Sequence, residues 1–321
     1  MAPRRAIGLA AAGLGGIAVA VQSRINGALA GQLHHPGAAA VLSFCTGLLL
    51  LLVVVAATRR GRQGLAGVRD AVRAGTLQWW HCLGGVLGAY LVVIQSLTVT
   101  VLGVAAFTVA AVAGQAAGGL LLDRSGAAPT GPQPVTPARA AGAALAVTAV
   151  LITVAGQLTR PQSLPLLLLP VAAGAGMAWQ QAANGRVRVT AGGAGPAALV
   201  SFAAGAVVLL FAFGIAVLAG DVPSGGLPTS PWMYLGGPLG VAFIAIAAAV
   251  VRHTGVLLLG LAMTVGQLTG AVVLDTVTPV PSSGGPSASM LTGVGLTILA
   301  TLIAAAGRPK TAPQHTPRSR R

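Results

Sequence analysis

Charged side chains are scarce in this chain. Only 23 of the 321 residues carry a charge, there is no glutamate, and the four acids are Asp70, Asp123, Asp221 and Asp275. Soluble proteins have about 25% charged residues, whereas this chain has 7% and is 55% hydrophobic. Too few charges remain to cover a water-facing surface. We therefore expect an all-α integral membrane protein, because lipid cannot satisfy an open backbone.

Cysteine and histidine are too few or too scattered to form a metal site. Cys45 and Cys82 lie in apolar runs without paired spacing, and the five histidines show no ligand spacing. The chain also lacks a phosphate-binding Gly-Lys-Ser/Thr loop and any convincing Ser/His/Asp or paired-carboxylate set. We expect no metal, no cofactor, no direct ATP drive and no enzymatic activity.

The excess of basic residues gives a formal net charge of +15, which raises the question of nucleic-acid binding. The basic residues lie in the gaps between apolar runs, and the densest groups, Arg59 to Arg73 and Arg308 to Arg321, flank such runs. Cytoplasmic anchors of membrane helices have this arrangement. We expect the lipid bilayer as a partner, no nucleic acid, and a disordered basic tail over 307–321 at the cytoplasmic face.

Ten apolar segments have the length of about 17 to 25 residues that a transmembrane helix needs. They cover residues 6–28, 37–57, 77–97, 102–122, 139–157, 165–185, 197–219, 232–251, 255–274 and 290–306. Lys and Arg accumulate in cytoplasmic loops, and ten spans place 17 of the 19 basic residues on the side of both termini, with only Arg24 and Arg160 opposite. This asymmetry predicts a multi-pass protein of the bacterial cell membrane with cytoplasmic termini.

The chain contains an internal repeat in two blocks. The first block pairs Gln22, Asn26, Gly27, Ser43, Phe44 and Gly47 with Gln180, Asn184, Gly185, Ser201, Phe202 and Gly205, at an offset of 158. The second pairs Trp80, Gly84, Gly85, Gly88, Gly103, Gly114, Gln115, Gly118, Leu122 and Asp123 with Trp232, Gly236, Gly237, Gly240, Gly255, Gly266, Gln267, Gly270, Leu274 and Asp275, at an offset of 152. Residues 1–160 and 161–306 thus form two five-helix copies. Five is an odd number, so the copies have inverted topology, which suits alternating access.

Two strings in the first copy resemble the YdcZ-like family of the drug/metabolite transporter superfamily. One runs from Gln22 to Gly27 and continues with Ser43, Phe44 and Gly47; the other runs from Trp79 to Gly85 and continues with Gly114-Gln115 and Leu122-Asp123. The chain is similar to a fused two-copy form of that family. The resemblance implies a ten-helix transporter with a cavity between its halves, but it implies little about the substrate.

Neutral amides are the main candidates for a substrate site, because polar side chains inside apolar helices mark function or packing. Gln22 and Asn26 share one helix face, and Gln180 and Asn184 repeat that pair beside Trp179 and Gln181. Amides donate and accept hydrogen bonds, which suits polar or zwitterionic solutes. The alternative is that the amides bridge helices.

Matched glycines four residues apart predict close helix packing. They are Gly84 and Gly88, Gly114 and Gly118, Gly236 and Gly240, and Gly266 and Gly270. Gln115 and Gln267 lie within two of these motifs and are expected either to pack there or to face the cavity.

Three charged residues near span ends are candidate gates. Asp123 closes the fourth span and Asp275 the ninth, on opposite membrane faces, where each can pair with arginine or remain a solvated helix-end carboxylate. Arg24 interrupts the first span and either reaches outward to water or attracts an anionic group.

The sequence therefore predicts a secondary transporter, and more narrowly an exporter, of a small polar metabolite or drug. No acid is expected at mid-membrane depth, which disfavours the glutamate-based cation export of small multidrug relatives. A lipid flippase and a non-transport scaffold remain alternatives, and homodimerisation, transport direction and coupling ion stay open.

Overall fold

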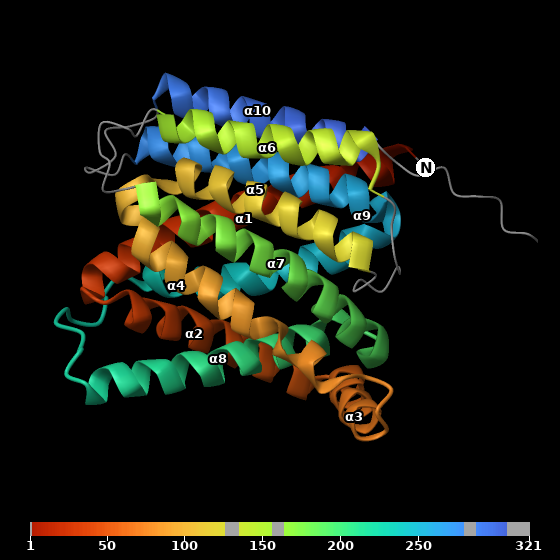
Figure 1. The fold of residues 1–321 in the computed structure, drawn as a ribbon. Helices are drawn as coiled ribbons and strands as arrows, with labels where there is room; N and C mark the ends of the chain where they lie inside the picture. Colours follow the sequence, from red (N-terminus) through yellow and green to blue (C-terminus); the bar gives the residue numbers. More distant parts are fainter. Residues whose placement is uncertain (1, 126–134, 156–163, 279–286, 307–321) are drawn as a thin grey trace, which may run out of the picture.

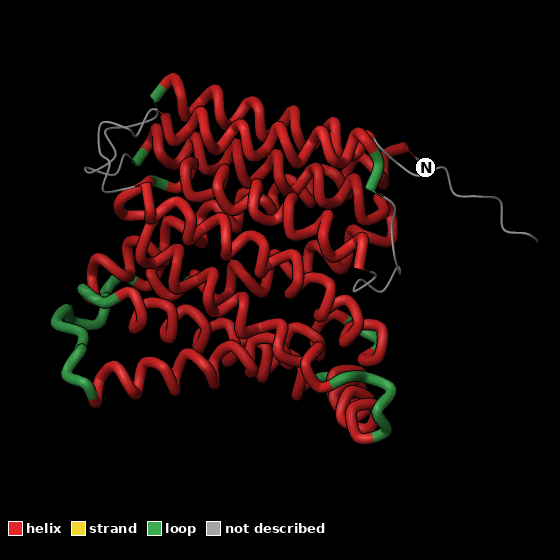
Figure 2. The backbone as a smooth tube through the Cα atoms, viewed as in Figure 1, coloured by secondary structure: helices red, strands yellow, loops and turns green. Residues whose placement is uncertain are grey.

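The computed structural model describes residues 2–125, 135–155, 164–278 and 287–306. Within these ranges the backbone is helix and loop, without strands (Figure 2). The helices are α1 (Ala2–Leu33), α2 (Pro36–Ala57), α3 (Arg59–Arg73), α4 (Gly84–Leu102), α5 (Val104–Ser125), α6 (Pro137–Ala155), α7 (Leu164–Ala191), α8 (Ala194–Leu218), α9 (Gly236–Val277) and α10 (Ala288–Ala306). Short 3-10 helices, η1 (Trp79–Leu83) and η3 (Pro231–Tyr234), precede α4 and α9. The basic tail lies outside the described residues.

Six helical segments are long and apolar enough to cross a membrane, counting the described residues alone. They are Ile7–Leu33, Pro36–Ala57, Trp79–Leu102, Val104–Leu122, Pro165–Ala191 and Ala194–Leu218. Two shorter apolar segments, Ala262–Val277 and Ala288–Ile303, follow. Eight of the expected spans fall on separate helices, whereas the spans expected at 232–251 and 255–274 both fall on α9.

The two ends of α9 run in opposite directions along α1. At its beginning, Gly236 lies against Asn26 and Gly240 against Gln22, so this end is antiparallel to α1. Near its end, Gly266 lies against Gly13 and Gly270 against Ile17, so the second part is parallel to α1. The chain therefore reverses direction within α9, although its backbone is helical throughout.

The segment from Arg59 to Arg73, expected as a loop, is helix α3. Thr58 caps it, since its Oγ1 accepts a hydrogen bond from the Gly61 N–H at 3.1 Å. Gly61, Gly64 and Val68 form its buried face, and its arginines are exposed. A Cβ on Gly64 would lie 2.7 Å from the Ala191 carbonyl oxygen, so α3 packs closely on the end of α7.

The helices form a bundle with α6 and α10 paired at one edge and α2 and α8 paired near the other (Figure 1). Helices α1, α4, α5, α7 and α9 lie between these pairs. Along the α2–α8 pair, Val55 contacts Gly195, the Phe44 and Phe202 rings are 5.1 Å apart, and His35 contacts Asp221. Sequence numbers rise along α2 as they fall along α8, so these two helices are antiparallel.

The glycines of the internal repeat make reciprocal close contacts. A Cβ on Gly84 would lie 2.7 Å from Asn184 Oδ1, and a Cβ on its counterpart Gly236 would lie 2.6 Å from Asn26 Oδ1. Four more pairs of equivalent glycines contact equivalent residues in the opposite half. Gly88 contacts Gln180 and Gly240 contacts Gln22; Gly85 contacts Ser201 and Gly237 contacts Ser43; Gly114 contacts Val171 and Gly266 contacts Gly13; Gly118 contacts Ala175 and Gly270 contacts Ile17. Each of the eight predicted packing glycines thus lies at a close contact with the other half of the chain.

Candidate functional site

Three of the four repeated amides line one cavity of about 120 Å³, here named the central cavity. They are Gln22 from α1 and Gln180 and Asn184 from α7. The remaining lining residues are Ser43, Phe44, Gly88, Leu91, Val92, Met177, Gln181, Phe202, Gly237, Gly240, Phe243 and Ile244. The repeat therefore brings the equivalent side chains Gln22 and Gln180 together from the two halves. That these amides bind a substrate stays a prediction.

Glycines on the facing helices make room for the central amides. A Cβ on Gly88 would lie 2.5 Å from Gln180 Nε2, and a Cβ on Gly240 would lie 2.9 Å from Gln22 Nε2. Within α7 and α8, Gln180 Nε2 and Asn184 Nδ2 donate to Ser201 Oγ at 3.3 and 3.2 Å. Gln180 Oε1 is buried and has no hydrogen-bond partner, so it can accept a hydrogen bond from a ligand or water.

Asn26 is not among the lining residues of the central cavity and belongs to a buried hydrogen-bond network. Its Nδ2 donates to Gln95 Oε1 at 2.8 Å, and Gln95 Nε2 donates to Ser23 Oγ at 2.9 Å. All three residues are at most 1% exposed, so this network joins α1 to α4. Asn26 Oδ1 is buried without a hydrogen-bond partner, and the substrate-binding role of Asn26 stays a prediction. Sequence reasoning missed Gln95, although a glutamine in the apolar run 77–97 was a usable signal.

A second cavity of about 260 Å³, here named the amide cavity, contains the other predicted glutamine pair. Its polar lining residues are Gln115, Gln181, Thr264, Gln267 and Thr301, and its apolar lining residues are Val112, Ala116, Gly142, Ala146, Phe243, Met263 and Ala300. Gln181 and Phe243 line both cavities. The two cavities therefore adjoin at this pair of side chains. Trp179 is not among the lining residues of either cavity.

The two cavities lie between helices that the sequence separates widely. The central cavity takes side chains from α1, α2, α4, α7, α8 and α9, and the amide cavity from α5, α6, α7, α9 and α10. Within the part of the chain whose side chains the structure describes, the lining residues of both cavities lack ionisable side chains. Such a site can recognise a ligand by neutral hydrogen bonds and apolar contact.

The candidate gate Asp275 caps a neighbouring helix in this structure. Gly103, with φ +80°, ends α4 in a conformation that favours glycine. Asp275 then accepts hydrogen bonds from the backbone N–H groups of Val104 and Ala105, at 3.1 and 2.8 Å, at the start of α5. Asp275 is 2% exposed, so the expectation of a solvated helix-end carboxylate is wrong here. The side chain of Asp123 lies outside the described residues.

Arg24 lies in an apolar groove of about 790 Å³ that shares no lining residue with the two cavities. Its guanidinium donates to the carbonyl oxygen of Thr278, at 2.6 Å, just beyond the end of α9. In this structure Arg24 therefore joins α1 to the end of α9, and it does not reach either cavity.

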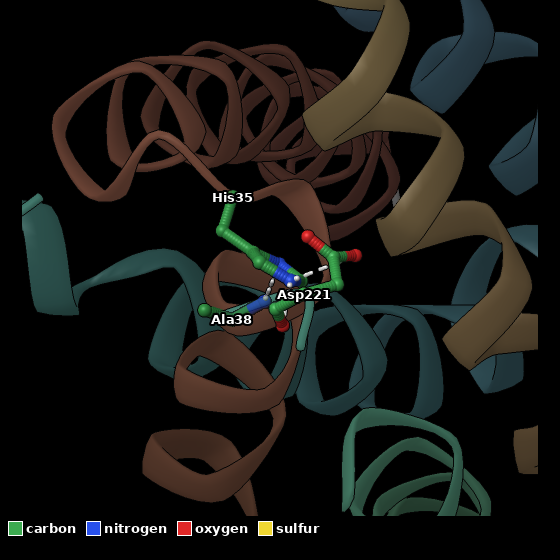
Figure 3. Close-up of polar contacts among 3 residues, drawn as sticks. All are labelled: His35, Ala38 and Asp221. Carbon is green, nitrogen blue, oxygen red and sulfur yellow. Dashed lines mark hydrogen bonds and ion pairs between the residues drawn. The ribbon is translucent and has the colours of Figure 1, made fainter. Parts of the chain in front are cut away.

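A histidine and an aspartate that sequence reasoning did not single out close the α2–α8 pair at one end (Figure 3). His35 Nδ1 accepts from the Ala38 N–H at 3.1 Å and so caps α2. His35 Nε2 lies 3.4 Å from Asp221 Oδ2 and 3.3 Å from the Asp221 carbonyl oxygen. Because Nδ1 accepts, the ring proton is on Nε2, which faces Asp221.

Comparison with protein families places both halves of the chain in one group. The family model described as "Putative inner membrane exporter, YdcZ" matches residues 7–152 and again residues 165–303. Neither a curated protein nor a solved structure matches the chain. The family match covers the helices that line both cavities.

Proposed function

We propose, from the premise that this chain belongs to the YdcZ family of inner membrane exporters, that it exports a small polar metabolite or drug by alternating access. The family and the apolar helices make it a multi-pass protein of the cell membrane and a transporter rather than an enzyme. The substrate and the alternating-access mechanism are the proposed part. One observation supports the proposed substrate and mechanism. Two adjoining cavities lie between helices of both halves, and five of the six repeated amides, all except Asn26, line them.

In the proposed mechanism Gln22, Gln180 and Asn184 bind the substrate in the central cavity. Gln115 and Gln267 bind it in the amide cavity, and it passes between the two beside Gln181 and Phe243. Arg24, Asp123 and Asp275 keep their predicted gating role as a hypothesis. For Asp275, gating would consist of releasing the two N–H groups at the start of α5.

The proposed architecture is ten spans in two inverted five-helix repeats, over residues 1–160 and 161–306. Three observations support it: the equivalent helices α2 and α8 are antiparallel, the glycine contacts are reciprocal, and α9 reverses direction. Inversion allows the two halves to exchange conformations and so open a shared cavity to each side in turn.

The proposed orientation has both termini in the cytoplasm. The 17-to-2 distribution of basic residues supports it. So does α3, whose exposed arginines suit the cytoplasmic leaflet, where anionic lipids attract basic segments.

Cysteine labelling from each side of the membrane tests alternating access without knowledge of the substrate. Cys45 and Cys82 are first replaced by alanine, and single cysteines are then placed at Gln22 or Gln180. We expect a membrane-impermeant thiol reagent to label both positions in right-side-out and in inside-out membrane vesicles. The matched control is Gln63→Cys on the exposed face of α3, which is expected to react only in inside-out vesicles.

Three results would contradict these proposals. Labelling of positions 22 and 180 from one side alone, under all conditions, would exclude alternating access through the central cavity. Labelling of position 63 in right-side-out vesicles would reverse the orientation. A purified protein that scrambles labelled phospholipid in liposomes, and moves no solute, would favour the flippase alternative.

A further inference from the structure

The amide cavity is lined by neutral polar side chains, and this composition favours uncharged ligands. Gln115 from α5, Gln181 from α7 and Gln267 from α9 line it, with the hydroxyl groups of Thr264 and Thr301. Gln115 and Gln267 are equivalent in the two repeats, whereas Gln181 corresponds to Ser23, so the third amide is present in one half alone. This cavity therefore offers three amides, each of which donates and accepts hydrogen bonds.

Among the side chains that the structure describes, the linings of both cavities include neither Asp, Arg, Lys nor His. Moving an unpaired charge out of water costs far more than a neutral hydrogen bond restores. A ligand with a carboxylate or an ammonium group would find no counter-ion among the described lining residues of either cavity.

The rest of the amide cavity limits the size and shape of the ligand. Its volume of about 260 Å³ lies just below the roughly 300–1,000 Å³ of pockets for drug-sized ligands. Its wall includes Phe243, Met263 and Val112, which suit an apolar face. The occupant is therefore about the size of one substituted ring.

We infer that the amide cavity binds an uncharged, one-ring-sized molecule that carries an amide or hydroxyl group, and that it discriminates against charged molecules of the same shape. This inference rests on the proposed function, because it names the substrate class of the proposed transporter. It narrows the polar or zwitterionic solutes expected from the sequence to uncharged ones.

Isosteric ligands that differ in charge test the inference on the purified full-length protein. Benzamide is uncharged, benzoate is its anionic isostere and benzamidinium its cationic isostere; nicotinamide and nicotinate form a second pair. Calorimetry at millimolar concentration suits the weak binding of such small ligands. We expect benzamide and nicotinamide to bind and their charged isosteres to bind at least tenfold more weakly.

Variants then locate the bound molecule. Gln115→Leu, Gln181→Leu and Gln267→Leu each remove an amide at similar volume, and each should weaken benzamide binding about fivefold, the effect of one neutral hydrogen bond of about 1 kcal/mol. Gln63→Leu on the exposed face of α3 is the matched control and should leave binding unchanged. If a leucine variant fails to fold, Thr264→Val and Thr301→Val remove a hydroxyl with little change of volume.

Three outcomes would overturn the inference: binding of benzoate or benzamidinium as tight as that of benzamide, no binding by either uncharged amide, or binding that the cavity variants do not change. These outcomes are separable from failure of the proposed function. If the cavity variants weaken benzamide binding while positions 22 and 180 react from one side alone, the binding site stands and alternating access fails. If those positions react from both sides and the charged isosteres bind best, alternating access stands and the inferred substrate class fails.

Discussion

At the scale of single residues, Gln95 connects α1 to α4 through hydrogen bonds to Asn26 and Ser23. Gln95→Leu keeps the volume but leaves the Asn26 amide and the Ser23 hydroxyl without that partner. A buried polar group that loses its partner costs about 1–3 kcal/mol. We expect a lower unfolding temperature in detergent, with little change for the exposed control Gln63→Leu. Equal unfolding temperatures for the two variants would show that the network does not stabilise the fold.

His35 gives a second prediction at this scale. His35→Ala removes a helix cap, a group in contact with Asp221, and an edge-to-face contact with Phe213 at 5.4 Å. Loss of a cap costs about 0.5–2 kcal/mol. Asp221→Ala should cost less, because this carboxylate is 73% exposed, and even a pair of opposite charges at such an exposed site contributes only about 0–1 kcal/mol. Thermal unfolding of the two variants compares them, and a larger loss for Asp221→Ala would contradict the capping role.

Three amides of the central cavity could be predicted from the sequence because they are scarce polar residues, repeated at a fixed offset, in apolar spans. Asn26 satisfied the same criteria, yet it is not a lining residue of the central cavity. Asn26 is held by its hydrogen bond to Gln95. Gln95 comes close to Asn26 because α4 packs on α1, and no sequence pattern around either residue indicates this contact. Pairing across helices was therefore the part that sequence reasoning could not supply.

At the scale of helices, the close approach of α4 to α8 depends on Gly85. A Cβ at this position would overlap the carbonyl oxygen of Ser201, which as backbone cannot move aside. We expect Gly85→Ala to lower stability by roughly 1–3 kcal/mol, the usual cost of overpacking, and Gly237→Ala to do the same against Ser43. Gly214→Ala on α8, where the added Cβ meets nothing within 4 Å, is the control. Unfolding temperatures in detergent test this, and equal values for all three variants would contradict it.

Helix positions were largely predictable because long apolar runs in lipid must be helical. Helix α3 was missed for a physical reason: its five arginines dominate its composition and suggest a loop. Its buried positions, Gly61, Gly64 and Val68, recur at spacings of three and four residues and so mark a helical face. The sequence predicted two separate spans, 232–251 and 255–274, where the structure has the single helix α9. The chain reverses direction within α9, yet its backbone remains helical.

At the scale of the whole molecule, Phe243 lies where the two cavities adjoin. If the amide cavity leads into the central cavity, Phe243→Ala should speed labelling of a cysteine at position 22 severalfold, and Phe243→Trp should slow it. A cysteine at Thr264, within the amide cavity, is the control and should keep its rate in both variants. Labelling rates at position 22 that do not depend on residue 243 would show that reagent reaches the central cavity by another route.

The reciprocal packing of the two halves also constrains the order of assembly during synthesis. Gly16 in α1 lies against Met263 and Gln267 in α9. Because these α9 residues come about 250 positions later in the chain, α1 leaves the ribosome long before its neighbour is synthesised. At about 5–20 residues per second, the gap between these segments corresponds to roughly 10–50 s. During that interval the small-residue face of α1 lacks the α9 neighbour on which it packs in the finished protein. The first half must therefore wait, inserted but incompletely packed, until the second half is translated.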